Sequence, residues 1–454
     1  MDTSFDLIQK YNVQIPRYTS YPTVPYWQND LEDNIDWEKI IKKSLLAEKA
    51  KNGISLYIHL PFCEQLCTYC GCNKRITKNH GVEKIYINAI LKEWQMYKAI
   101  LGDKISIKEI HLGGGTPTFM SPENLKFLIE QILIDLTLED NYEFSFEGHP
   151  NNTSYLHLKT LYDIGFRRVS FGVQDLDEKV QIAINRVQPL EKTKQVTDWA
   201  REIGYDSINF DLIYGLPFQT NDSIVKTIKE VIKLKPNRIA FYSYAHVPWT
   251  QKAQRAYDES DLPIGKEKYA LYSIGKNMLV EAGYEDVGMD HFAFKTDSLL
   301  KSKLEGLLHR NFMGYTTNNT EILIGLGVSA ISDVFFGYRQ NLKTVESYYE
   351  SLEQNKLPIF RGINLSEEDV LYRKQILNIA CKGKTDWNKK IELSEYEIEQ
   401  LNVMQKDGLL NWENDALVIT ELGWSFLRNI CAVFDKKMNA DLFKNDAPKF
   451  SQAI

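Results

Sequence analysis

Six segments with the composition of β-strands alternate along the chain with amphipathic stretches of helical periodicity. The strand-like segments are residues 54–60, 109–112, 143–146, 168–172, 207–214 and 238–244. The helical stretches between them include residues 82–101, 123–136, 193–203 and 223–234. Strand-helix units in series predict a parallel sheet, either doubly wound or curved into a full or partial barrel. In such folds the carboxyl ends of the strands carry the chemistry.

Polar and glycine-rich segments follow the predicted strand ends. They are residues 59–72, 113–117, 147–150, 174–175, Asp211 near the end of the fifth strand, and 245–246. We therefore expect the six strand ends to surround one mouth. The three glycines at 113–115 lack the spacing of a dinucleotide- or phosphate-binding loop, and a flexible turn is the simple alternative. Their place next to the first loop favours backbone that approaches a ligand closely.

Four of the six cysteines fall within ten residues, at Cys63, Cys67, Cys70 and Cys72. The C-x3-C-x2-C spacing of the first three lets their thiolates converge on one iron-sulfur cluster. A cubane cluster held by three cysteines leaves one iron free to bind a small molecule. A structural zinc site is the alternative, but such sites usually draw ligand pairs from two separated segments, and no second pair occurs. Disulfides are less favoured at these short spacings.

Composition restricts the partners of the chain. Its 454 residues carry a formal net charge of -7, which argues against a nucleic-acid-binding protein. The first residues lack the basic and apolar regions of a signal peptide. The most apolar later stretch, residues 322–328, is far shorter than the ~20 residues of a membrane span. We expect a cytoplasmic enzyme that meets any anionic substrate with local Arg, Lys or His.

Ten short motifs in a fixed order identify a resemblance between residues 11 and about 435. They are residues 16–23, 63–72, 113–117, 172–175, 185–188, 211–217, 244–246, 288–292, 308–312 and 325–332. In this order they resemble the oxygen-independent coproporphyrinogen III oxidases, also called dehydrogenases, a family of radical S-adenosylmethionine (SAM) enzymes. The resemblance implies a partial (β/α)6 barrel of radical SAM type, with an N-terminal arm and a mainly helical C-terminal domain.

The resemblance also implies a reaction. An external electron, from a reduced flavodoxin- or ferredoxin-like protein, reduces the cluster, and SAM is cleaved to methionine and a 5'-deoxyadenosyl radical. The radical removes hydrogen from a propionate β-carbon of coproporphyrinogen III. Loss of CO2 and one more electron leaves a vinyl group. Two propionates react in this way, which gives protoporphyrinogen IX.

By resemblance, Cys63, Cys67 and Cys70 hold one [4Fe-4S] cluster. Cys72 is expected to be catalytic without ligating the cluster, and it is typical of the decarboxylase branch. The family binds two SAM molecules in one site. The first is expected to contact Tyr57, Gly114, Glu147 and Ile331. The second is expected to contact Tyr69, Gly115, Thr116, Gln174, Arg186, Asp211 and Ala245.

The residue types suit these contacts. Glu147 can pair with an α-ammonium group and Arg186 with a carboxylate, and Asp211 can accept bonds from ribose hydroxyls or an ammonium group. Taken singly, each acid has a structural alternative as the partner of a helix N-terminus or an arginine. Tyr57 and Tyr69 have an alternative as core aromatics.

The strongly anionic substrate needs cations near the barrel mouth. Our candidates are Arg17 and Arg310, with surface or structural ion pairing as the alternative. One position departs from the family, because residues 147–150 read Glu-Gly-His-Pro where Glu-Val-Asp-Pro is familiar. His149 thus replaces an acid. We expect Cys381 and Cys431 to be core thiols.

We divide the chain into an N-terminal arm (1–50), a barrel domain with an extension (51–365) and a C-terminal domain (366–454). In the last, residues 393–408, 410–419 and 420–434 predict helix, short β-pair and helix, as in a winged-helix-like module. We expect this domain and the arm to cover the mouth of a monomeric enzyme, with packing of the arm on the barrel wall as the alternative for the arm. The rival functions are a heme chaperone of the same superfamily, which does not decarboxylate, and a zinc-stabilised binding module. Cys72 and residues 16–23 favour the enzyme.

Overall fold

Parallel strands form the centre of the fold. The computed structural model describes residues 5–29, 34–46, 52–102, 105–386, 393–442 and 450. Within them, a 13-stranded sheet has the order β1-β17-β16-β15-β14-β2-β5-β6-β7-β8-β9-β11-β10. The six predicted strands are β2 (Ile54–Leu60), β5 (Ser106–Gly114), β6 (Thr137–Gly148), β7 (Phe166–Gln174), β8 (Ser207–Tyr214) and β9 (Arg238–Ser243). Each pairs in parallel with the next one along the chain, which confirms their predicted order.

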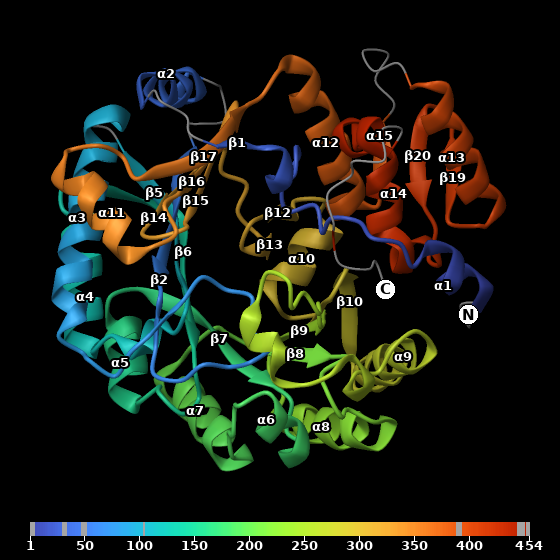
Figure 1. Ribbon diagram of the computed structural model, residues 1–454, viewed down its shortest axis with the longest axis horizontal. Helices are drawn as coiled ribbons and strands as arrows, with labels where there is room; N and C mark the ends of the chain where they lie inside the picture. The colour runs from blue at the N-terminus through green and yellow to red at the C-terminus, as the bar shows by residue number, and fades with distance from the viewer. Residues whose placement is uncertain are drawn as a thin grey trace.

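Helices connect these strands and cover the outer face of the curved sheet (Figure 1). They are α3 (Val82–Leu101), α4 (Pro122–Leu133), α5 (Tyr155–Asp163), α6 (Glu178–Ala183), α7 (Leu190–Ile203) and α8 (Asn221–Leu234). The partial barrel expected from the sequence is therefore confirmed. No helix in the described part of the chain is long and apolar enough to cross a membrane.

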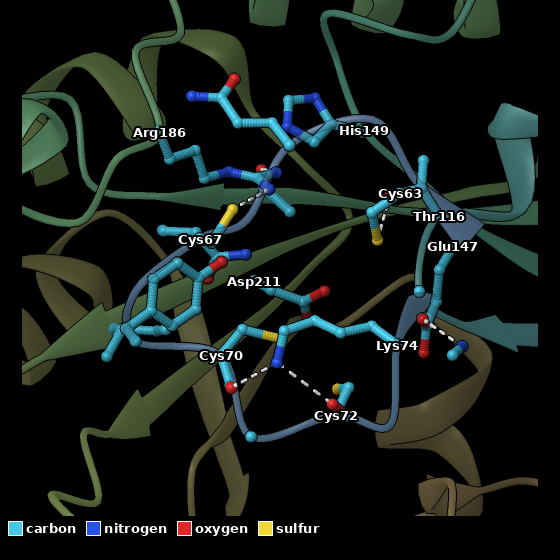
Figure 2. A pocket seen from close by; sticks show the side chains of 18 of the residues that line it. Cys63, Cys67, Cys70, Cys72, Lys74, Thr116, Glu147, His149, Arg186 and Asp211 are labelled. Atoms are coloured by element: carbon cyan, nitrogen blue, oxygen red, sulfur yellow. Dashed lines mark hydrogen bonds between the residues drawn. The ribbon is translucent and has the colours of Figure 1, made fainter. Parts of the chain in front are cut away.

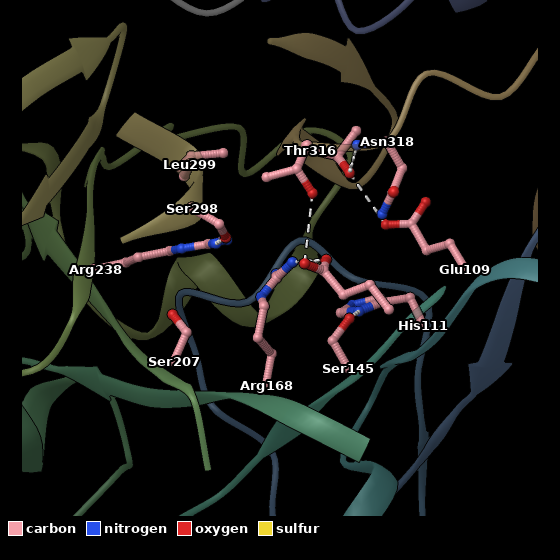
Figure 3. A network of polar contacts seen from close by, with 12 residues as sticks. Glu109, His111, Ser145, Arg168, Ser207, Arg238, Ser298, Leu299, Thr316 and Asn318 are labelled. Atoms are coloured by element: carbon pink, nitrogen blue, oxygen red, sulfur yellow. Dashed lines mark hydrogen bonds and ion pairs between the residues drawn. The ribbon is translucent and has the colours of Figure 1, made fainter. Parts of the chain in front are cut away.

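Side chains of the central strands divide between two environments, because successive residues of a strand point to opposite faces. On β6, Phe144 and Phe146 are buried in the core that the sheet shares with the helices. Ser145 and Glu147, which alternate with them, line an interior cavity of about 180 Å³. Arg168 and Arg238 also line this cavity, where Arg168 pairs with Glu143 and Arg238 donates to Asp297 over 2.6 Å (Figure 3). The barrel interior is thus polar.

Both edges of the central sheet continue further than we predicted. β14 (Ile322–Leu326) is parallel to β2, and antiparallel strands follow it: β15 (Ile331–Val334), β16 (Gly337–Asn341), β17 (Ile359–Asn364) and β1 (Gln28–Asn29). On the other edge lie α9 (Lys266–Glu281), β10 (Tyr284–Gly288) and β11 (His291–Phe294). A connection with α10 (Ser298–Leu304) leads to the hairpin β12 (His309–Asn311) and β13 (Gly314–Thr316), and α11 (Val345–Glu353) precedes β17.

The C-terminal part is mainly helical, as predicted. It contains α12 (Glu367–Lys382), β18 (Lys384–Asp386), α13 (Glu395–Lys406), β19 (Leu410–Glu413), β20 (Ala416–Ile419), α14 (Leu427–Val433) and α15 (Lys436–Leu442). The predicted helix, β-pair and helix are present, although the second of these helices, α14, begins only at Leu427, after a 3-10 turn. Cys381 and Cys431 are buried in the core here, as expected.

The N-terminal arm contains α1 (Phe5–Tyr11) and α2 (Asn34–Leu45). Tyr11, Ile15, Tyr18 and Tyr21 belong to the same buried cluster as the side chains of α12 and α14. The first half of the arm is therefore packed into the C-terminal core. Parts of the predicted arm (1–4, 30–33 and 47–50) and of the predicted C-terminal domain (387–392, 443–449 and 451–454) lie outside the described residues.

Candidate active site

A cavity of about 820 Å³ opens at the carboxyl ends of the parallel strands (Figure 2). Fourteen of the predicted site residues line it: Arg17, Cys63, Cys67, Tyr69, Cys70, Cys72, Gly114, Gly115, Thr116, Glu147, Gln174, Arg186, Asp211 and Ala245. Tyr57, Ile331 and Arg310 are not among the lining residues. The fold thus brings together, at the carboxyl ends of the strands, side chains that lie far apart in the sequence.

The cysteine loop leaves β2 and is anchored at its base and on one side. Cys63 lies in the short strand β3 (Phe62–Cys63), which pairs with β4 (Arg75–Ile76). On the side, the Thr68 backbone N–H donates to the Ile184 carbonyl over 3.0 Å. All four cysteines of the loop are free thiols. In the described residues, no three His, Cys, Asp or Glu side chains converge as they would on a single metal ion.

Hydrogen-bond donors surround the sulfur atoms. Thr116 Oγ1 lies 3.4 Å from Cys63 Sγ, and Arg186 Nη1 donates to Cys67 Sγ over 3.7 Å. Lys74 Nζ donates to the carbonyls of Cys70 and Cys72, at 3.0 and 3.3 Å (Figure 2). Burial raises the pKa of the Cys63 thiol to about 11. Three soft ligands on one cavity wall, with donors and cations beside them, fit an iron-sulfur cluster.

The three glycines are closely packed: Gly113 against Tyr57 and Glu147, Gly114 against the end of β2, and Gly115 against the start of the cysteine loop. A Cβ atom on Gly115 would lie 2.5 Å from the Pro61 carbonyl oxygen, and one on Gly114 would lie 2.7 Å from the His59 ring. Gly114 also has a φ of 116°, which side chains rarely adopt. The close approach that we expected toward a ligand is therefore, in the first place, an approach to β2 and, at Gly115, to the cysteine loop.

Glu147 is held at the end of β6 with one side open to the cavity. Its Oε2 accepts a hydrogen bond from the Gly114 backbone N–H over 3.1 Å. His111 Nε2 lies 3.5 Å from Oε1, and His111 Nδ1 lies 2.8 Å from Ser145 Oγ. The side chain keeps 43% of its surface exposed, so the carboxylate can accept a further donor from a ligand. His111 was missed by sequence reasoning, although its position before the glycines was a signal.

Asp211 and Arg186 place opposite charges on the cavity wall. Asp211 accepts hydrogen bonds from Ser170 Oγ over 2.8 Å and from Asn209 Nδ2 over 2.9 Å. Burial raises the pKa of the Asp211 carboxyl to about 6. Arg186 is only 8% exposed, and its Nε has no partner among the described residues. An anionic group of a ligand would satisfy that buried donor.

His149, which replaces the familiar acid, lines the cavity beside Arg186 (Figure 2). Its Nδ1 accepts the Asn151 backbone N–H over 3.1 Å. Burial, together with the nearby Arg186 guanidinium, lowers the pKa of His149 well below its usual value. This position therefore presents a neutral imidazole where the family pattern has a carboxylate.

Tyr57 and Ile331, two of the three predicted residues that do not line the cavity, pack against other side chains of the fold. Tyr57 stacks on His111 with ring centroids 6.0 Å apart, and its hydroxyl lies 3.0 Å from His59 Nδ1. His59 Nε2 in turn lies 2.9 Å from the Asn73 carbonyl of the cysteine loop. Ile331 packs in an apolar cluster with Trp27. Tyr57 thus supports both Glu147 and the loop.

The two candidate arginines are placed differently. Arg17 lines the cavity, and its guanidinium contacts Asp290 Oδ2 at 3.2 Å and the Ser243 carbonyl at 2.9 Å. Arg310 is 6% exposed, and its Nη2 donates to the Arg17 carbonyl over 3.4 Å. The structure therefore does not bring Arg310 to the cavity, because it is buried behind the arm that carries Arg17.

Comparisons with known proteins agree with this geometry. Residues 57–231 match the Radical SAM superfamily. The whole chain is 36% identical to an oxygen-independent coproporphyrinogen III oxidase of Synechocystis, covering 98% of that protein. It is 38% identical to one of Pseudomonas aeruginosa, over 95% of each protein. The solved structure of the Escherichia coli coproporphyrinogen III oxidase, described as a radical SAM enzyme, superimposes with a TM-score of 0.88 at 34% identity, covering 96% of this chain and 99% of that one.

Proposed function

The chain belongs to the oxygen-independent coproporphyrinogen III oxidase family of the radical SAM superfamily, and from that premise we propose its reaction. The chain is a radical SAM oxidoreductase that converts two propionate side chains of coproporphyrinogen III to vinyl groups. The product is protoporphyrinogen IX, an intermediate of heme synthesis. The main support for this function is the full-length similarity to the oxidases, together with the position of Cys72 on the wall of the active-site cavity. The heme-chaperone alternative is not favoured.

Cys63, Cys67 and Cys70 would hold one [4Fe-4S] cluster, which when bound supplies the electron that cleaves SAM. Their placement on one wall of the cavity supports this ligand set. The Thr116 hydroxyl lies within hydrogen-bonding distance of Cys63 Sγ and can donate to a thiolate there, and Arg186 donates to Cys67 Sγ. Such hydrogen bonds stabilise thiolates and raise the reduction potential of a bound centre.

Two SAM molecules would bind in the same cavity. Glu147 keeps an open carboxylate edge for an α-ammonium group, and Asp211 offers a second acceptor on a different strand. Arg186 supplies a buried donor for a carboxylate. A volume of about 820 Å³ lies in the upper part of the range of small-molecule sites, which supports more than one ligand.

Cys72 would act on the substrate side of the loop. It lies beyond the three ligands, lines the cavity and is exposed. The Lys74 ammonium group fixes its backbone by donating to its carbonyl. A thiol held there can reach a reacting group without belonging to the cluster.

Arg17 would bind a propionate at the mouth of the cavity. It belongs to the N-terminal arm, lines the cavity and carries a positive charge. Closure by the arm keeps water away from the radical. We further propose that the enzyme is a cytoplasmic monomer reduced by a flavodoxin- or ferredoxin-like protein. Its fourfold carboxylated substrate is then recruited by local charge, because the net charge of -7 opposes long-range attraction.

Anaerobic turnover tests the function. The protein, reconstituted with iron and sulfide, is mixed with coproporphyrinogen III, SAM and a reductant. We expect protoporphyrinogen IX and two CO2 per substrate, and no product without SAM. Stoichiometric heme binding with no decarboxylation would instead identify a chaperone.

A further inference from the structure

A second cavity, of about 450 Å³, lies between α12 and residues 308–335. It shares no lining residue with the active-site cavity. Asn319, Thr320 and Glu321 border it immediately before β14 begins, so it lies at the amino-terminal end of the parallel strands. The active site is at the opposite end. The reaction of the enzyme therefore does not account for this space.

One face of α12 forms a wall of the cavity. Its members follow helical spacing: Val370, Arg373, Lys374, Leu377, Asn378, Cys381 and Lys382. Such a spacing places them on one stripe of the helix. A stripe that faces a neighbouring element is normally apolar throughout, but this one alternates cations with apolar side chains.

Charge on this wall is mostly positive. Arg373 pairs with Asp333 over 2.7 Å. Lys374 and Lys382 are exposed, and neither forms an ion pair with another described residue. Leu377 lies between them, and Leu308 and Phe335 supply apolar surface from other elements. A neighbouring cavity of about 380 Å³ shares Lys382.

We infer that this cavity binds an amphipathic organic carboxylate, with an apolar body beside Leu377 and Phe335 and carboxylates at Lys374 and Lys382. The volume of about 450 Å³ is typical of small-molecule sites, which combine apolar walls with a few polar anchors. Two ammonium groups on one wall, neither in an ion pair with a described residue, match a ligand that carries two carboxylates. A porphyrin dicarboxylate and an aliphatic dicarboxylic acid share this chemistry.

Binding of protoporphyrin IX and of decanedioate to the full-length protein, each measured by equilibrium dialysis, tests the inference. Lys374→Glu/Lys382→Glu reverses both charges at exposed positions. Lys384→Glu, an exposed lysine in β18 outside the cavity, is the matched control. We expect the double variant to weaken binding of at least one probe by about tenfold or more, because two charge-assisted bonds become repulsive. Lys384→Glu should bind as the unaltered protein does.

The outcomes distinguish the site from the catalytic one. Loss of probe binding in the double variant but not in Arg17→Ala, whose side chain lines the active-site cavity, supports a separate site, and the identity of the tighter probe gives the source of the ligand. Asn378→Trp, which fills the cavity from α12, should also abolish binding. Equal affinity in the double variant and the control would overturn the inference, and so would complete competition by inorganic phosphate, which has no apolar body. These measurements need no turnover, so they stand apart from the proposed reaction.

Discussion

Single residues of the cysteine loop have separable roles. Cys63→Ser, Cys67→Ser or Cys70→Ser should each abolish the cluster and SAM cleavage, because a centre with two thiolate ligands is unstable and open to solvent. Cys72→Ser should keep the cluster and lose decarboxylation. Iron and sulfide content, the visible spectrum and product formation measure these effects. A normal cluster in any of the first three variants, or loss of iron from the Cys72 variant, would refute the ligand assignment.

The carboxylate of Glu147 is expected to bind the ammonium group of SAM. Glu147→Gln keeps the shape but removes the charge, and a hydrogen bond to a charged group contributes roughly 1.5 to 3 kcal/mol. SAM affinity should fall about tenfold or more with the cluster intact. Calorimetric titration of the reconstituted protein measures it. Glu64→Gln is the control, since it removes an exposed carboxylate of the same cavity at the cysteine loop; an equal loss there would deny Glu147 a specific role.

The raised pKa of Asp211 predicts that the affinity for SAM depends on pH. Burial raises its pKa to about 6, so the carboxyl is mostly protonated at pH 5 and mostly ionised at pH 7. Because a ligand that donates to both oxygens needs the ionised form, SAM affinity should rise by up to about tenfold between these pH values. Binding titrations at several pH values test this. Asp211→Asn should bind SAM weakly with little of this pH dependence, and an unchanged pH profile in that variant would exclude Asp211 as its cause.

At the scale of elements, the six central strands could be predicted because each has an apolar face that packs on a helix. The strands at the edges could not. β16 reads Gly-Tyr-Arg-Gln-Asn and is buried along its length. Its polar side chains are satisfied by hydrogen bonds that no local pattern reveals, such as Asn341 Nδ2 to Glu93 Oε1 at 2.6 Å. Hydrophobic periodicity does not detect a strand whose buried side chains are polar and hydrogen-bonded to one another or to other elements.

The same limit applied to the site. Strand ends indicated the cavity, since parallel strands bring their carboxyl ends together. His111 lies within β5, and polar side chains inside a strand were not predicted to face the interior of the barrel. Arg310 was selected for its charge, and only the fold reveals that the arm covers it. Burial by elements distant in sequence was the missing information.

The N-terminal arm carries the prediction about substrate. Arg17→Ala should raise the KM for coproporphyrinogen III several-fold and leave uncoupled SAM cleavage near its original rate, because Arg17 lines the cavity from the arm and its guanidinium bonds to Asp290 and Ser243. Arg17→Lys should recover only part of the loss, since Lys cannot hold a carboxylate bidentately. Steady-state kinetics under anaerobic conditions measure both variants. Unchanged kcat and KM in Arg17→Ala would place the propionates elsewhere.

At the scale of the whole molecule, the N-terminal arm contributes side chains to a buried cluster as well as to the lining of the active-site cavity. The predicted boundaries at residues 50 and 365 separate segments that share a buried cluster, in which Tyr18 packs with side chains of α12 and α14. Tyr18 is 2% exposed and donates its hydroxyl to Asp435 Oδ2 over 3.2 Å. Its φ of 49° is uncommon for a bulky residue. Tertiary packing must offset that conformational cost.

Unfolding of the full chain tests whether the arm is structural. Tyr18→Ala removes a buried ring and its hydrogen bond, so the free energy of unfolding should fall by about 3 to 5 kcal/mol. Val13→Ala, at a position 48% exposed in the same arm, should change it by less than about 0.5 kcal/mol. Urea denaturation followed by near-ultraviolet circular dichroism measures both. If Tyr18→Ala is as stable as Val13→Ala, the arm is only a loose cover. The expected loss would instead mean that closing the active site and completing the C-terminal core are one packing event, so that a damaged core would also weaken substrate binding at Arg17.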